Sequence, residues 1–173
     1  SHGHTIFHQP EIGLTMQIGD GYQIYKETEI KTVFDLRSMD LAFEGQGAPL
    51  VPVGDHFLFS VYDFCLNLGG FSNISFISSG ERLAFDVCPV NIVLNALSHR
   101  LGFDYDKKGD IARSGNLMPD LLKRLNNIKY YQHPPPKSLG FEWVDKFIFP
   151  LLKEGAPHDL LNTFCHHISH QIG

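Results

Sequence analysis

The stretch Phe85–Asn91, FDVCPVN, carries the first side chain of the sequence that could do chemistry. Asp86 ends an apolar run and is followed by a cysteine and by Pro89, a residue that suits the first turn of a helix. A carboxylate at this place has two interpretations. It either caps the turn by accepting backbone hydrogen bonds, or it acts as a general base in a cleft. These residues alone leave both interpretations open.

Two glycines between apolar runs, in LNLGGFSN, form the second candidate site. Gly69 and Gly70 are flanked by Asn67 and Asn73. The backbone N–H groups of such a turn can cradle a phosphate or another anion, although the same dipeptide also makes an ordinary hairpin turn. The sequence here is compatible with both.

Two further stretches have the residue types of metal sites without completing the pattern. DYDKKGD, residues 104–110, begins like a calcium loop, but Lys108 and Gly115 stand at its fifth and twelfth positions. HHISH places His166 and His170 one helical turn apart, as in zinc hydrolases, but His167 replaces the catalytic glutamate. We therefore expect a solvated loop, a solvated polar helix face and no metal site. A histidine-based metal hydrolase remains a third interpretation of function.

The elements that must position these residues begin with short extended runs. Four strands are expected in the first part of the chain, at residues 5–9, 14–19, 22–28 and 32–37, with GDG as a turn. Small residues and prolines at 45–52 indicate a domain junction. From Tyr62 onward, three strands joined by two tight turns predict a β-meander that reaches Asp86.

After the meander the apolar period changes from that of a strand to that of a helix. Pro89 is expected at the first helical position and Gly102 at the stop, with an apolar stripe made by Val90, Val93, Leu94, Leu97 and Leu101. Residues 118–127, residues 141–152 and the C-terminal segment predict three more helices. Residues 130–140, YYQHPPPKSLG, predict an extended connector.

Composition excludes several classes of protein. The chain has 173 residues, 43% of them hydrophobic, and a formal net charge of −5, which favours a packed core and argues against nucleic-acid binding. Its apolar runs are shorter than a membrane span and no signal peptide is recognisable, so no membrane partner is expected. The three cysteines form no CxxC pair, which fits a reducing, cytoplasmic location.

The two ends of the chain lead to a separate expectation. The sequence begins with SHGH instead of methionine, and it stops inside a segment whose apolar residues keep helical spacing. We expect a fragment of a longer protein.

Seven stretches, taken in order, resemble the anhydro-N-acetylmuramic acid kinase family. They are SHGHTIFHQP, QIGDG, FDLRSMDLAFEGQGAPLVP, LNLGGFSNISF, FDVCPVN, YDKKGDIARSG and PPPKSLGFEW, and they cover nearly the whole chain. The resemblance implies an α/β fold of the actin-like ATPase type, with ribonuclease H-like sheets in two domains. Residues 1–53 would then end the first domain. Residues 54–173 would begin the second domain and include a helical substrate-side region.

The resemblance also implies an activity and the residues that perform it. Asp86 matches the catalytic base, which activates a water to open the 1,6-anhydro ring of the sugar while O6 takes the γ-phosphoryl group of ATP, with Mg²⁺ as cofactor. The residues that match the phosphate loop are Asn67, Gly69, Gly70 and Asn73. Those on the substrate side are Arg37, Asn91 and His2.

The sequence departs from the family pattern near the base. Cys88 and Val90 stand where glycines are common, and His4 stands in place of a glutamine. These changes fit a divergent enzyme, or alternatively a non-catalytic actin-like interaction module. Because the phosphate loop of the first domain and the adenosine loop are missing, we expect the chain alone to be inactive and to bind ATP weakly. The expected partners are a small sugar and, for the protein, a possible homodimer.

Overall fold

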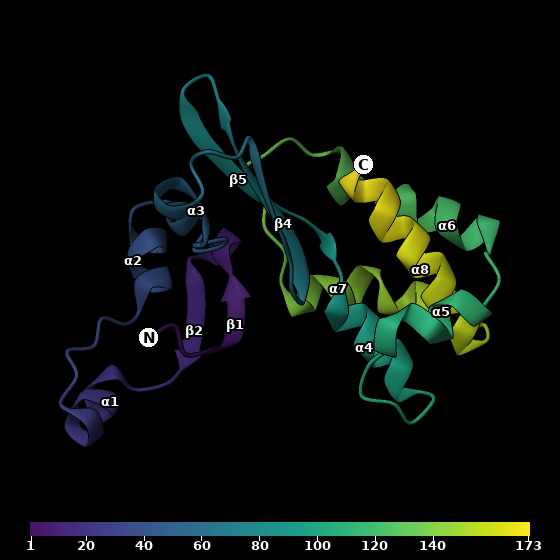
Figure 1. The fold of residues 1–173 in the computed structure, drawn as a ribbon, viewed down its shortest axis with the longest axis horizontal. Coiled ribbons are helices and arrows are strands. Elements are labelled where there is room, and N and C mark those ends of the chain that lie inside the picture. Colours follow the sequence, from purple (N-terminus) through teal and green to yellow (C-terminus); the bar gives the residue numbers. More distant parts are fainter.

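The computed structural model describes the backbone of residues 1–173 and the side chains of these residues other than Glu11. Figure 1 shows a central β-sheet with two groups of elements on either side of it. The N-terminal elements, a hairpin and short helices, lie on one side, and the C-terminal helices lie on the other. The architecture is α/β with small antiparallel sheets.

The N-terminal part is built around a hairpin of β1 (His4–Gln9) and β2 (Leu14–Ile18), which pair antiparallel. These two strands agree with the prediction. The helices that follow are α1 (Gly21–Thr28), α2 (Leu36–Ala42) and α3 (Pro52–Leu58).

The two other strands predicted in this part were wrong. Residues 22–28 form α1, because Asp20 of GDG caps the helix instead of making a turn: its carboxylate accepts hydrogen bonds from the N–H groups of Tyr22 and Gln23. Residues 32–35 are irregular, and α2 begins at Leu36. Residues 45–52, which were predicted to be a domain junction, run into α3, whose Pro52 stands in the first turn, where a missing N–H costs nothing.

The predicted meander is confirmed as β3 (Phe64–Leu68), β4 (Phe71–Ser78) and β5 (Glu81–Pro89). Pro89 therefore ends a strand, opposite Phe71, and does not open the next helix as predicted. The pairing of β4 with β5 contains a bulge: Ser72 lies opposite Cys88, but Asn73 lies opposite Asp86. Val87 is the extra residue of this bulge.

The first turn of α3 is joined to the meander by a buried polar group. Asp55 is 8% exposed, and its carboxylate accepts a hydrogen bond of 2.6 Å from the Ser75 hydroxyl on β4. The Arg82 guanidinium on β5 donates to the same hydroxyl at 2.9 Å. Because all three groups are hydrogen-bonded, the carboxylate can be buried at this contact.

The C-terminal part is helical. Its elements are α4 (Asn91–His99), α5 (Asp110–Ser114), α6 (Pro119–Asn126), α7 (Phe141–Phe147) and α8 (Pro157–Ile172). Short 3₁₀ helices at Lys107–Gly109, Lys129–Gln132 and Phe149–Leu152 connect them. Residues 133–140 of the predicted connector contain no helix or strand. The apolar core lies among these helices and includes Val93, Leu97, Leu125, Val144, Ile148, Leu152, Leu160, Leu161 and Phe164.

Two motifs that resembled metal sites have structural roles. Both carboxylate oxygens of Asp106 accept hydrogen bonds, from the N–H groups of Ile111 and Ala112, so this residue caps α5. His166 and His170 are exposed on α8, as predicted. His167 is fully buried, so the prediction of a solvated face was wrong for this residue. Among the described residues, no group of three or more His, Cys, Asp or Glu side chains could hold a metal ion.

None of the helices in the described part of the chain is long and apolar enough to span a membrane.

The contact between α5 and α8 depends on a glycine. An added Cβ at Gly115 would lie 2.1 Å from the carbonyl oxygen of His158 at the start of α8. Beside it, the Asn116 N–H donates to the Asp159 carboxylate at 2.7 Å. The backbone at residue 115 therefore approaches α8 more closely than any side chain allows.

We predict that Gly115→Ala lowers the free energy of unfolding by about 1–3 kcal/mol, because the methyl group must displace backbone atoms. Denaturant unfolding measures this. Gly54→Ala is the matched control, since an added Cβ at Gly54 meets nothing within 4 Å. Equal stability of the Gly115→Ala variant and the parent would contradict this account of the contact.

Candidate active site

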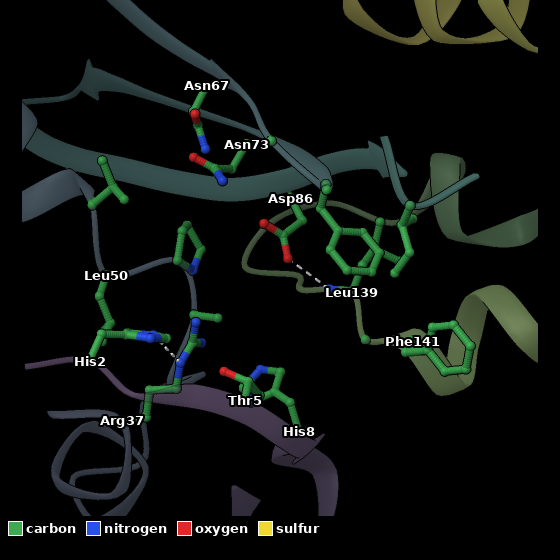
Figure 2. Close-up of a pocket in the computed structure, with 18 of the residues that line it drawn as sticks. His2, Thr5, His8, Arg37, Leu50, Asn67, Asn73, Asp86, Leu139 and Phe141 are labelled. Atoms are coloured by element: carbon green, nitrogen blue, oxygen red, sulfur yellow. Dashed lines mark hydrogen bonds between the residues drawn. The ribbon is translucent and has the colours of Figure 1, made fainter. Parts of the chain in front are cut away.

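A cavity of about 420 Å³ lies between the N-terminal hairpin and the meander. It brings together most of the residues singled out from the sequence. These are His2, Arg37, Asn67, Gly69, Gly70, Asn73 and Asp86. Figure 2 shows Asn67, Asn73 and Asp86 on the sheet side of the cavity, and His2 and Arg37 across from them.

Strand register places three of these polar side chains in one row. Asn67 on β3 lies opposite Asn73 on β4, and Asn73 lies opposite Asp86 on β5. Residues directly opposite in an antiparallel sheet point to the same face, with Cβ atoms about 4.5–5.5 Å apart. The row therefore presents two amides and one carboxylate to the cavity.

Asp86 is 5% exposed and is held by residues far away in the sequence. One of its carboxylate oxygens, Oδ2, accepts a hydrogen bond of 2.8 Å from the Leu139 N–H (Figure 2). Its own N–H donates to the Lys137 carbonyl at 3.1 Å, and its carbonyl accepts from the Tyr130 hydroxyl at 2.7 Å.

Burial raises the pKa of Asp86 from 3.8 to about 6. Desolvation is the main cause, because it penalises the charged form. The Leu139 hydrogen bond and the positive charge of Arg37 both act in the opposite direction and keep the carboxylate ionisable. The group is therefore ionised at neutral pH but readily accepts a proton, which is the property a general base needs.

Arg37, in the first turn of α2, is fixed by two acceptors on its own side of the cavity. Its Nε donates to His2 Nε2 at 2.8 Å, and its Nη1 donates to the Gly47 carbonyl at 2.8 Å. The Gly47 N–H in turn donates to the Asp40 carboxylate at 2.7 Å, which holds the junction against α2. Since a guanidinium has five N–H donors, these two bonds leave others for a ligand.

The tautomer of His2 follows from its partners. Its Nε2 accepts from Arg37, so the proton resides on Nδ1, which lies 2.9 Å from the Gly3 carbonyl. His2 thus orients the arginine instead of competing with it for an anion.

Gly69 and Gly70 form the turn of the β3–β4 hairpin at the end of the cavity. The Gly70 carbonyl accepts hydrogen bonds from the N–H groups of Val90 and Ile92, which ties the turn to the start of α4. An added Cβ at Gly70 would meet nothing within 4 Å. Packing within this chain therefore does not require a glycine at position 70. A ligand that approaches the backbone closely would require one.

Asn91, which the resemblance assigned to the substrate side, lies outside the cavity. Asn91 is the first residue of α4 and does not line the cavity; its N–H donates to the Gly69 carbonyl at 3.2 Å. The structure adds cavity residues that the sequence pattern did not indicate, among them Thr5, His8, Phe141 and Glu142.

These features define a class of protein. It is an α/β protein whose meander carries a buried carboxylate, two amides and a glycine turn, facing an arginine across one cavity. Such a cavity suits a small, polar, anionic ligand.

The family model of anhydro-N-acetylmuramic acid kinase matches residues 1–172. Curated proteins named anhydro-N-acetylmuramic acid kinase are similar as well. The one from Shewanella putrefaciens is 37% identical over 99% of this chain and 51% of its own length. Those from Aliivibrio fischeri and Acinetobacter baylyi are 39% and 40% identical, over 91% and 84% of this chain and 45% and 42% of their own lengths.

The chain belongs to the anhydro-N-acetylmuramic acid kinase family, which confirms the resemblance found in the sequence. It spans about half the length of the curated relatives it matches.

The raised pKa of Asp86 has a cost in stability. Above pH 6 the buried carboxylate is ionised and lowers the stability of the fold. This destabilisation is relieved as the pH falls from about 6 toward 3.8. His167 acts in the opposite direction, because burial lowers its pKa to about 4 and stability is lost as pH falls below 6.5. The two contributions oppose each other in nearly the same pH range.

We predict that Asp86→Asn raises the free energy of unfolding at pH 8 by about 1–3 kcal/mol, since the amide removes the buried charge and keeps an acceptor for Leu139. The difference from the parent should shrink as the pH falls from 7 to 4. Denaturant unfolding across this range measures it, with Asp104→Asn, at an exposed carboxylate, as control. A variant less stable than the parent at pH 8 would contradict this prediction.

Proposed function

We propose that this chain provides the general base, the sugar-binding arginine and one phosphate loop of an ATP-dependent kinase. The kinase opens the 1,6-anhydro ring of anhydro-N-acetylmuramic acid and phosphorylates O6. Family membership supports the choice of substrate. The observation that carries the proposal is the placement of Asp86 and Arg37 on opposite sides of one cavity.

In the proposed reaction, Asp86 accepts a proton from a water molecule. The water oxygen forms a bond with the anomeric carbon, and the bond between that carbon and O6 breaks. The released O6 would form a bond with the γ-phosphorus of ATP while the bond from that phosphorus to the bridging oxygen breaks, which releases ADP, and the proton remains on the Asp86 carboxyl group. Because the pKa of Asp86 is about 6, the carboxylate is mostly ionised at neutral pH and still basic enough to assist.

Arg37 has the chemistry to bind the acidic part of the sugar. The lactyl group of muramic acid carries a carboxylate, and a guanidinium forms charge-assisted hydrogen bonds with carboxylates. Arg37 lines the cavity, and its bonds to His2 and Gly47 use only two of its five N–H donors. Its positive charge also lowers the pKa of Asp86, which opposes the effect of burial.

We assign the phosphates of ATP to the turn at Gly69 and Gly70, flanked by Asn67 and Asn73. The open space beside Gly70 supports this assignment. Mg²⁺ would neutralise phosphate charge when bound; it commonly keeps several waters and needs few protein ligands. A site for Mg²⁺ made of phosphate oxygens and water is compatible with the lack of a metal cluster among the described residues.

The actin-like fold and the domain division at residues 53 and 54 are part of the same proposal. The antiparallel meander that follows the junction is compatible with the start of a second actin-like domain. In such a protein the nucleotide lies between two domains, and this chain spans about half of its relatives. A cytoplasmic location and a homodimer remain predictions.

We predict that Asp86→Asn, in a full-length family protein that carries these 173 residues, lowers turnover of the anhydrosugar by about 10²–10⁴. The amide keeps the shape of the side chain but accepts no proton from water, and ATP affinity should stay nearly unchanged. A coupled ADP-release assay measures turnover, and Asp104→Asn is the control. Turnover within about tenfold of the parent would remove Asp86 from the mechanism.

We predict that Arg37→Ala weakens sugar binding by about 1.5–3 kcal/mol and leaves nucleotide binding unchanged, because the charge-assisted bonds are lost. Calorimetry with the anhydrosugar measures the effect. Arg113→Ala is the matched control, since Arg113 is exposed and paired with Asp110. Unchanged sugar affinity of Arg37→Ala would place this residue outside the binding site.

A further inference from the structure

One segment, residues 130–139, makes all three hydrogen bonds described for Asp86. The Tyr130 hydroxyl donates to the Asp86 carbonyl, the Lys137 carbonyl accepts from the Asp86 N–H, and the Leu139 N–H donates to Oδ2. The segment therefore runs along the outer edge of β5 and covers it at this residue. Tyr130 and Leu139 are 9% and 4% exposed, so water has little access to replace these bonds.

These bonds determine the direction of the carboxylate. The backbone of Asp86 is held on both its donor and its acceptor, and one carboxylate oxygen is held as well. The rotation of the side chain is thereby restricted, and the other oxygen, Oδ1, is left for the cavity. A base whose direction is fixed before substrate binds needs no reorganisation during the reaction.

The segment is itself held in place near Tyr130. The Lys137 ammonium lies 4.8 Å from the centre of the Tyr130 ring and 5.4 Å from that of Phe85. The Trp143 ring lies 5.2 Å from the Tyr130 ring. Three consecutive prolines at residues 134–136 fix φ between the two ends of the segment.

A second anchor reaches the segment from α8. The Tyr131 hydroxyl lies 3.0 Å from His167 Nε2, and His167 Nδ1 lies 2.6 Å from Asn126 Oδ1. Because the amide oxygen is an acceptor, the proton resides on Nδ1 and Nε2 accepts from Tyr131. His167, the fully buried member of the HHISH motif, thus ties α8 and α6 to the residue next to Tyr130.

We propose that residues 130–139 are the positioning element of Asp86, acting through the Tyr130 hydroxyl and the Leu139 N–H, and that His167 anchors this element through Tyr131. The inference rests on the proposed function, in which Asp86 is the base. It assigns a role to Tyr130 and His167, which lie outside the seven stretches that resemble the family, and to Leu139, which lies in PPPKSLGFEW but is given no role by the resemblance.

The charged and titratable groups around Asp86 come from several elements. Arg37 faces it from α2, Tyr130 from the 3₁₀ helix, and His2, His8 and Glu142 line the same cavity. The Leu139 N–H carries no charge, but of the two contacts that lower the pKa of Asp86 it has the larger effect. Its removal is therefore the most direct test.

The first experiment replaces the amide at Leu139 by an ester, through incorporation of the hydroxy acid that corresponds to leucine, in a full-length family protein. The ester removes the N–H and keeps the side chain. Carbon-13 labelled aspartate reports the titration of Asp86 by NMR, and its signal is the one absent in Asp86→Asn. We expect the midpoint to move to higher pH by about one pH unit, together with the acid limb of the pH–rate profile.

The second experiment compares hydroxyl deletions. Tyr130→Phe should lower kcat by about tenfold or more with an unchanged KM for the sugar, because the base is misdirected while the binding groups remain. Tyr131→Phe, which disconnects His167, should act in the same direction with a smaller effect. Tyr105→Phe, at an exposed tyrosine, is the control.

The outcomes separate the two proposals. An unmoved NMR midpoint in the ester variant, or unchanged kcat in Tyr130→Phe with lowered stability only, would show that the segment is merely structural and overturn this inference. Retained turnover in Asp86→Asn would instead contradict the proposed function, while the NMR midpoint would still report whether the segment acts on Asp86.

Discussion

The arrangement of the cavity is governed by the burial of one carboxylate. Asp86 is 5% exposed, and a buried charge is costly unless other groups compensate for it. The compensation comes from two directions, a neutral N–H at Leu139 and a positive charge at Arg37. Neither cancels the cost of burial, so the pKa stays raised. Arg37 comes from α2 and is held by His2 and Gly47, and Leu139 comes from the connector.

The meander and the later helices could be predicted because their signals are local. Alternating side chains and glycine turns indicate strands, and the stripe from Val93 to Leu97 indicates a helix whose apolar face is indeed buried. Asp86 and the turn at Gly69 could be singled out as candidates from their local sequence, but their roles, and the choice of Arg37, came from resemblance to a family. Local signals failed where one residue has two uses. Asp20 reads as a turn residue but caps α1, and Pro89 reads as a helix start but ends β5.

The partners of Asp86 and of His167 could not be predicted from local pattern. Tyr130 and Leu139 are 44 and 53 positions away from Asp86, and the connector that contains them has no periodicity to indicate which face is buried. His167 lies in a run of polar residues, and its burial becomes possible only because Asn126 and Tyr131 satisfy both ring nitrogens. Such long-range pairings are properties of the packed structure, and a single sequence carries no sign of them.

The bulge at Val87 lets one strand serve two environments. In a regular strand, successive side chains point to opposite faces of the sheet. The residues after one that faces a cavity would then point alternately away from the cavity and toward it. In β5 the side chains of Val87 and Cys88 are both buried, directly after Asp86. The extra residue resets the alternation, so the apolar packing beyond it is no longer tied to the register of the polar row. Substitutions that repack the interior after residue 87, at Cys88 or Val90 for example, can therefore be made without turning the Asp86 carboxylate away from the cavity.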